Sequence, residues 1–166
     1  MNNPRRKTTC DHLLEIVSLV ILGATIFPFI HFGKLAKMAS IPIHFGINGK
    51  VDGWENPYLL WFIPAIAITL YMGLTYIERQ YKKFHYPVKI KNEEMADAIY
   101  RLGICLIRHI KPVVLAIFCF ISNSVFLVAT HRMERLCMPV FYVLIGCFFI
   151  VILFYLVKMT GLRKRY

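Results

Sequence analysis

Charged residues are scarce in this sequence. They make up 17% of the 166 residues, whereas hydrophobic residues make up 58% and the mean hydropathy is +0.57. A soluble domain of this size has about 25% charged and about 45–50% apolar residues. This composition excludes a disordered chain and argues against a soluble enzyme. The length allows one domain, which we place over residues 1–166.

Motifs of catalysis and cofactor binding are missing as well. The sequence has no glycine-rich phosphate loop, no nucleophile elbow and no zinc-protease motif. Its five cysteines have no metal-binding spacing. We therefore expect a protein that is not an enzyme, with no catalytic residue, no metal site and no cofactor.

Long apolar runs are what the sequence has instead. Four of them reach about 20 residues, the length that crosses a hydrocarbon core of about 30 Å. They cover residues 13–32, 57–77, 112–130 and 138–157. The last three contain no charged residue, while the first contains Glu15 and Pro28. The predicted fold class is an all-α integral membrane protein with four transmembrane helices.

The basic residues predict how these helices are oriented. Fifteen Lys and Arg residues lie in the N-terminal tail, the middle loop and the C-terminal tail, against five in the other two loops. Because cytoplasmic loops carry the excess of Lys and Arg, both termini and the middle loop are predicted to be cytoplasmic. The net charge of +11 is thus mainly a topology signal that also suits anionic headgroups. We expect no nucleic-acid partner.

The predicted outer loop at residues 41–54 has the pattern of a short β-hairpin. Apolar residues alternate before Asn48-Gly49, the strongest signal for a two-residue turn. Such a turn places His44 opposite Gly53 and away from Asp52, unless a bulge at Gly46 restores the His44–Asp52 contact. The loop is either a structured connection with aromatic residues at the membrane interface or part of an external recognition surface.

The predicted cytoplasmic loop contains an amphipathic helix over residues 92–111. Asn92 is a suitable N-cap, and the helix starts with two glutamates. An apolar stripe is expected at Met95, Ile99, Leu102 and Leu106, with Asp97, Arg101 and Arg108 away from it. We expect this helix to lie on the membrane surface and to form an elbow into the third span at Pro112. Residues 79–111 are also the expected docking region for a cytoplasmic protein.

A few polar residues fall inside the predicted spans. They are Glu15 in the first span and Ser122, Asn123 and Ser124 in the middle of the third. Glu15 is near enough to the span's start to reach the interface, and the Ser-Asn-Ser cluster suits helix packing better than ligand binding. Pro28 and Pro64 are expected to kink or unwind their helices.

Histidines and carboxylates also gather on the predicted outer side. They are His31, His44 and His131 with Asp52, Glu55 and Glu134. Their separate segments and their spacing do not favour a metal site.

The 41–54 segment resembles a known membrane family, the domain of unknown function 1648. The positions that carry the resemblance are Ile41, Pro42, His44, Phe45, Gly49, Asp52, Gly53 and Trp54. Pro64 and the helix around residues 92–108 extend it, whereas residues 55–57 depart from the usual pattern. The same domain opens bacterial immunity proteins against a sporulation-delaying peptide toxin. The resemblance implies a bacterial inner-membrane protein with a role in peptide resistance or envelope sensing.

These observations lead to one functional hypothesis and one alternative. The leading hypothesis is a small multi-pass protein of the cytoplasmic membrane whose outer hairpin recognises an extracellular peptide or envelope ligand. The alternative is a subunit of an oligomeric transporter or small permease, with a polar path past Ser122 and Asn123. Its partners would include the lipid bilayer and further copies of the chain.

Overall fold

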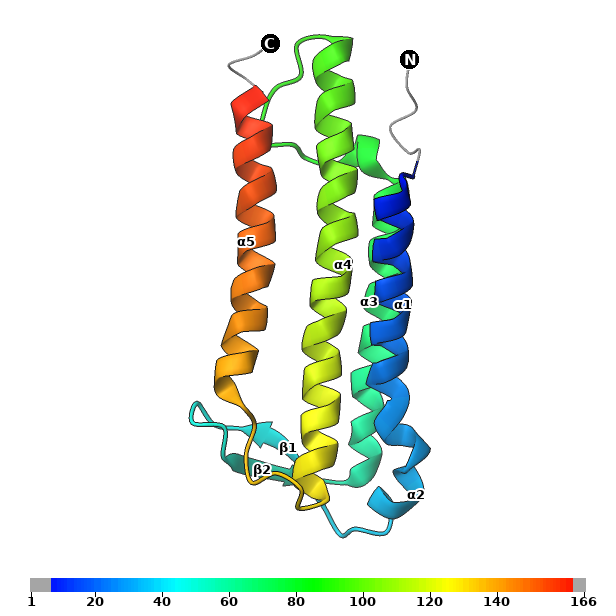
Figure 1. The fold of residues 1–166 in the computed structure, drawn as a ribbon, viewed down its shortest axis with the longest axis vertical. Coiled ribbons are helices and arrows are strands. Elements are labelled where there is room, and N and C mark those ends of the chain that lie inside the picture. The colour runs from blue at the N-terminus through cyan, green and yellow to red at the C-terminus, as the bar shows by residue number, and fades with distance from the viewer. Residues whose placement is uncertain (1–6, 163–166) are drawn as a thin grey trace.

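The chain forms a bundle of four long helices that is closed at one end by a small β-hairpin (Figure 1). The structure is a computed structural model, and it describes residues 7–162. The long helices are α1 (Thr9–Ile30), α3 (Phe62–Arg79), α4 (Glu93–Ala129) and α5 (Met138–Leu162). The remaining elements are α2 (Phe32–Leu35), β1 (Ile41–Phe45), β2 (Val51–Glu55), and the short 3₁₀ helices η1 (Pro57–Trp61) and η2 (Tyr81–Lys83).

All four long helices, α3 being extended by η1, are long and apolar enough to cross a membrane. They cover nearly all of the four predicted spans, which suits a multi-pass membrane protein. Below, the "hairpin end" is the end of the bundle that carries β1 and β2. The "terminal end" is the opposite end, where α1 begins and α5 finishes (Figure 1). Arg5, Arg6, Arg163, Lys164 and Arg165, which contributed to the predicted orientation, lie outside the described residues.

Local sequence signals start two of the helices. Thr8 and Asp11 form a capping box at α1, in which the Asp11 carboxylate accepts a 2.7 Å hydrogen bond from the Thr8 backbone N–H. At α4 the Asn92 side chain accepts a 2.8 Å hydrogen bond from the Met95 N–H. Asn92 is therefore the N-cap that the sequence predicted.

The predicted elbow at Pro112 is wrong. The helix that begins at Glu93 continues through Pro112 to Ala129 as a single element of 37 residues. At about 1.5 Å per residue it is about 55 Å long, well beyond the roughly 30 Å hydrocarbon core. The segment 93–111 therefore extends α4 along the bundle instead of turning onto a surface. Pro64 also makes no break, because it lies in the first turn of α3, where its missing N–H is not needed.

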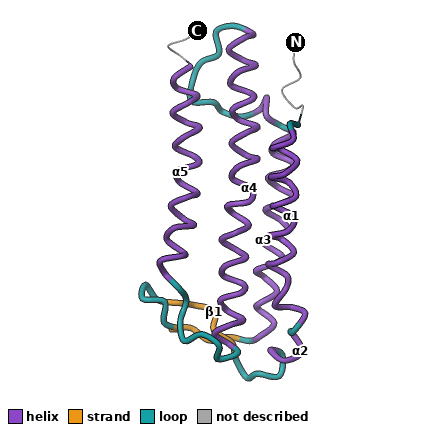
Figure 2. Tube along the Cα trace, viewed as in Figure 1, coloured by secondary structure: helices purple, strands orange, loops and turns teal. Residues whose placement is uncertain are grey.

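The apolar stripe of the α4 extension is covered within the chain. Met95 and Ile99 are fully buried, whereas Leu102 and Leu106 are only partly buried. The loop between α3 and α4, drawn in teal in Figure 2, folds back on the extension. There Tyr86 lies so close to Gly103 that a Cβ at that glycine would stand 2.6 Å from the tyrosine hydroxyl. Arg108, which was predicted to lie away from this stripe, is nevertheless buried, with 5% of its surface exposed.

The hairpin is present, but its turn is longer than predicted. Gly46 and Lys50 close a three-residue loop, since the Gly46 N–H donates a 2.9 Å hydrogen bond to the Lys50 carbonyl. Gly49 has φ +78°, whereas Asn48 keeps a negative φ and accepts a hydrogen bond from the Lys50 N–H. A three-residue loop that ends in a left-handed glycine is a common hairpin connection. His44 lies opposite Gly53 as predicted.

The rest of the predicted strand pairing shifts with this turn. Phe45 pairs with Val51 instead of Asp52, and Pro42 instead of Ile43 pairs with Trp54. The irregularities that allow this lie on either side of His44 and not at Gly46.

The core of the bundle lies at the hairpin end. It joins α1, α2, β1, η1 and α4 through Phe29, Leu35, Ile41, Leu60, Val125, Phe126 and Ala129. Away from this core, α5 is mostly exposed, and its buried residues are Tyr155 and Met159 near the terminal end. The large exposed apolar surface of α5 suits contact with lipid.

The straight course of α4 can be tested by a distance measurement. We expect spin labels at Glu94→Cys and Thr130→Cys, in a cysteine-free background, to lie about 54 Å apart by pulsed electron paramagnetic resonance, because 36 residues of helix separate them. A right-angled elbow at Pro112 would shorten this distance to about 38 Å. A distribution centred near the shorter value would contradict the continuous helix.

Candidate functional site

The hairpin brings His44 and Asp52 together at the surface. His44 Nδ1 is in direct contact with Asp52 Oδ1, although the two residues are not cross-strand neighbours. Gly53, opposite His44, makes this approach possible: a Cβ at Gly53 would stand 2.7 Å from the His44 Cβ. Both side chains of the pair are more than half exposed. They therefore remain accessible to a ligand from solution.

The eight motif residues separate into structural and exposed groups. Ile41 and Pro42 are buried, Phe45 packs against the core, and Gly49 forms the turn. The side chains of His44, Asp52 and Trp54 are exposed, and Trp54 remains 53% accessible. The motif thus supplies both the anchor of the hairpin and the polar and aromatic groups on its surface.

The turn of the hairpin is fixed to the connection between α4 and α5. The Leu136 N–H donates a 2.9 Å hydrogen bond to the Gly49 carbonyl, and the Tyr142 hydroxyl lies 3.5 Å from the Ile47 carbonyl. A Cβ at Gly49 would stand 2.2 Å from the Leu136 carbonyl oxygen, so only glycine fits here. The hairpin end is therefore one assembled surface built from both halves of the chain.

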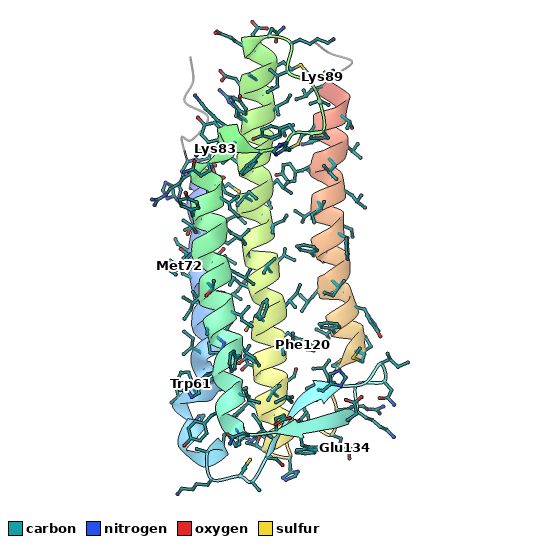
Figure 3. The ribbon with its side chains drawn as sticks, turned by 180° about the vertical axis from the view of Figure 1, so that it is seen from behind. Trp61, Met72, Lys83, Lys89, Phe120 and Glu134 are labelled. Carbon is teal, nitrogen blue, oxygen red and sulfur yellow. The ribbon has the colours of Figure 1, made fainter. Side chains whose placement is uncertain are left out.

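An open groove of about 890 Å³ lies between β2 and this connection. Its lining residues are Lys50, Val51, Trp54, Val128, His131, Met133, Glu134 and Arg135. Glu134 is labelled beside the strands in Figure 3. A second hollow of about 560 Å³ on the turn includes His44 and Asp52. The groove combines apolar side chains, one exposed tryptophan and charged groups, which is a lining suited to binding.

The three histidines of the predicted outer side make separate contacts. His31 packs between Phe27 and Phe126, with ring centroids 5.8 Å and 5.7 Å away. His131 lines the groove, while His44 contacts Asp52. Within residues 7–162, no group of three or more His, Cys, Asp or Glu side chains could hold a metal ion.

At the terminal end, Glu15 belongs to a buried cluster of charges. Lys111 Nζ lies 3.0 Å from Glu15 Oε2 and 3.7 Å from Glu78 Oε2. Arg108 lies 2.8 Å from Asp11 and 2.9 Å from Glu78.

The same cluster includes a tyrosine, because the Tyr71 hydroxyl donates a 2.5 Å hydrogen bond to Glu15 Oε1. Five charged side chains from α1, α3 and α4 therefore meet at one level of the bundle. Both carboxylate oxygens of Glu15 therefore contact residues of neighbouring helices.

The sequence interpretation missed the partners of Glu15, although a spacing signal was present. Asp11 and Glu15 are four residues apart, and Arg108 and Lys111 are three apart. Each pair therefore occupies one face of its helix. One acidic face and one basic face at the same end of neighbouring spans were the pattern to recognise.

Ser122 and Asn123 pack α4 against α1. The sequence favoured this role over ligand binding. The Ser122 hydroxyl donates a 2.8 Å hydrogen bond to the Thr25 carbonyl, and Asn123 Nδ2 lies 3.1 Å from the Ala24 carbonyl oxygen. Ala24 is the residue four positions before Pro28, which has no N–H to donate to it. Asn123 thus replaces the hydrogen bond that the proline removes. Ser124 is buried on the same helix.

Comparison with known proteins identifies part of the chain. Residues 19–68 match the family model described as Domain of unknown function (DUF1648), which confirms the resemblance of the 41–54 motif. The matched segment runs from α1 through the hairpin into α3. Neither the curated proteins nor the solved structures contain a match to this chain.

Because Asn123 supplies the hydrogen bond that Pro28 removes from α1, the effects of substituting these two residues on stability should be coupled. Asn123→Leu should destabilise the protein, because the Ala24 carbonyl loses its donor. In a Pro28→Ala background the restored backbone N–H takes that role, so the same change should cost about 0.5–1 kcal/mol less. Unfolding in mixed micelles measures both values.

A matched control is Thr69→Val, which removes a hydroxyl that bonds within α3. Its effect should simply add to that of Pro28→Ala. Additive effects of Asn123→Leu and Pro28→Ala would contradict the assigned role of Asn123.

Proposed function

We propose that this chain, which carries a DUF1648 domain at residues 19–68, is a receptor-like protein of the bacterial cytoplasmic membrane. Its hairpin end would bind an extracellular peptide or envelope ligand, and the protein would act by binding and not by catalysis. The excess of Lys and Arg at the terminal end supports an orientation with that end in the cytoplasm. The function would be envelope sensing or resistance to an antimicrobial peptide.

The observation that carries this proposal is the groove beside β2. Its volume of about 890 Å³ lies within the range of ligand sites. Trp54 offers a large exposed aromatic surface, of the type that contributes most to binding at interfaces. Lys50 and Arg135 outnumber Glu134 in the lining. This charge balance favours an amphipathic ligand that carries acidic groups.

The His44–Asp52 pair supports recognition at the same surface. A connecting loop needs no exposed pair of this kind, whereas a recognition surface gains specificity from polar groups held in fixed positions. Gly53 and the irregular pairing around His44 keep the pair in place. The pair lies on the turn side of the hairpin, where it would contact a ligand that extends beyond the groove.

The α4 extension and the preceding loop are the proposed cytoplasmic output. Met95 and Ile99 are covered, so a protein partner would contact the polar surface of residues 79–111 instead of the apolar stripe. Glu93, Glu94 and Arg101 are exposed there. The permease alternative gains no support from Ser122 and Asn123, because both donate hydrogen bonds to α1.

Trp54 provides a direct test of the groove. The chain has two tryptophans, so Trp61→Phe leaves Trp54 as the only tryptophan reporter. Titration with a synthetic acidic amphipathic peptide should give a saturable blue shift in the fluorescence of the protein in nanodiscs. A basic peptide of matched length should bind more weakly, and Lys50→Gln with Arg135→Gln should weaken the acidic peptide about tenfold.

The converse reporter, Trp54→Phe, retains only Trp61 and controls for general disturbance of the bilayer. Its emission should stay constant throughout the titration. The absence of a saturable change at Trp54, or an equal response at Trp61, would overturn the proposed groove.

A further inference from the structure

We propose that the terminal end carries a binding surface for the headgroups of anionic phospholipids. The surface consists of Lys7, Lys82, Lys83 and Lys158, which stand around α1, α3 and α5. It is independent of the groove at the hairpin end. Its basis is a separation of charge: at this level of the bundle the carboxylates lie inside with Arg108 and Lys111, and these four lysines lie outside.

The carboxylates at this level belong to the buried charge cluster around Arg108 and Lys111. The side chains of Asp11, Glu15 and Glu78 are only 10%, 22% and 12% exposed. All three face Arg108 or Lys111. Arg108 and Lys111 offset two of the three negative charges within the bundle, and Lys7 lies 3.9 Å from Glu15, so the cluster contributes little negative potential to the outer surface.

The lysines remain on the outside. Lys82 and Lys83 are exposed in η2, directly after α3, and Figure 3 shows Lys83 at that end of the bundle. Lys158 is exposed on α5, with its Nζ 4.4 Å from the centroid of the Phe154 ring. Lys7 is partly exposed and lies 3.9 Å from Glu15. Within residues 7–162, Lys82, Lys83 and Lys158 form no ion pair with a carboxylate.

These lysines stand at the level where the apolar surface ends. Tyr76 and Ile77 are exposed on α3 just before η2, and Val157 is exposed just before Lys158. Apolar and aromatic side chains on the bilayer side, followed by long cationic side chains, are the arrangement found at membrane interfaces. The level is shared by α5 and α4, because the Tyr155 hydroxyl lies 3.1 Å from His109 Nδ1, next to Arg108.

Within residues 7–162, the remaining carboxylates of this end form no ion pair with Lys82, Lys83 or Lys158. Glu93, Glu94 and Asp97 lie in the first turns of α4. The ten undescribed residues add five basic and no acidic side chains in sequence.

The test compares lipid binding to the full chain in a non-ionic detergent. Native mass spectrometry counts the bound molecules of phosphatidylglycerol and of phosphatidylcholine with the same acyl chains. We expect a clear preference for phosphatidylglycerol. Lys82→Gln with Lys83→Gln should reduce this preference by at least about fivefold, and Lys82→Arg with Lys83→Arg should retain it, because each cation near anionic headgroups strengthens binding about fivefold.

The control is Lys34→Gln with Lys37→Gln, which removes the same charge from exposed residues at the hairpin end. This control should leave the preference unchanged. Equal retention of the two lipids by the wild-type chain would overturn the proposal. An equal loss in the control and in the Lys82–Lys83 variant would also overturn it, since net charge alone would then explain the binding.

Discussion

Two cations on adjacent turns of α4 hold three helices at one level. Arg108 and Lys111 are almost fully buried, and their partners come from α1 and α3. Removing one partner of a buried ion pair costs about 3–5 kcal/mol, because the other charge stays desolvated. The three helices therefore cannot slide past one another without breaking these contacts. The same cluster divides α4 into a half that is apolar enough to span a membrane and an extension. Lys82, Lys83 and Lys158 are exposed around it.

The opposite end depends on one close approach between backbones. Gly49 lies against Leu136, where its lack of a side chain lets the hairpin turn bond to the connection before α5. Along most of its length α5 packs mainly on α4 and exposes its apolar side chains. The hairpin, which lies within the segment that matches the DUF1648 model, is thus bonded to the connection before α5 and forms one wall of the groove. A ligand in that groove would contact both β2 and the connection between α4 and α5.

Sequence patterns predict those features that depend on residues close to one another in the chain. Run length predicts the four helices, and Asn92 and Asn48-Gly49 correctly mark a helix start and a hairpin. The turn length was wrong because only Gly49 adopts a positive φ, a choice set by its contact with Leu136. The burial of Arg108 was not predicted, because local periodicity cannot show that Asp11 and Glu78 lie beside it. Pro112 was predicted to separate a surface helix from the third span. The helix α4 nevertheless continues through it, because tertiary packing overrides the local preference.

The claim on which the functional account depends is that the two ends of the bundle face opposite sides of the cytoplasmic membrane. Single cysteines at Lys50 and Lys89, in a chain without its five native cysteines, test this in intact bacteria with a membrane-impermeant maleimide. Lys50 is exposed at the hairpin end and Lys89 at the terminal end. The account predicts labelling at position 50 and none at position 89 until the cells are opened. Labelling at position 89 alone would place the groove in the cytoplasm and contradict an extracellular ligand.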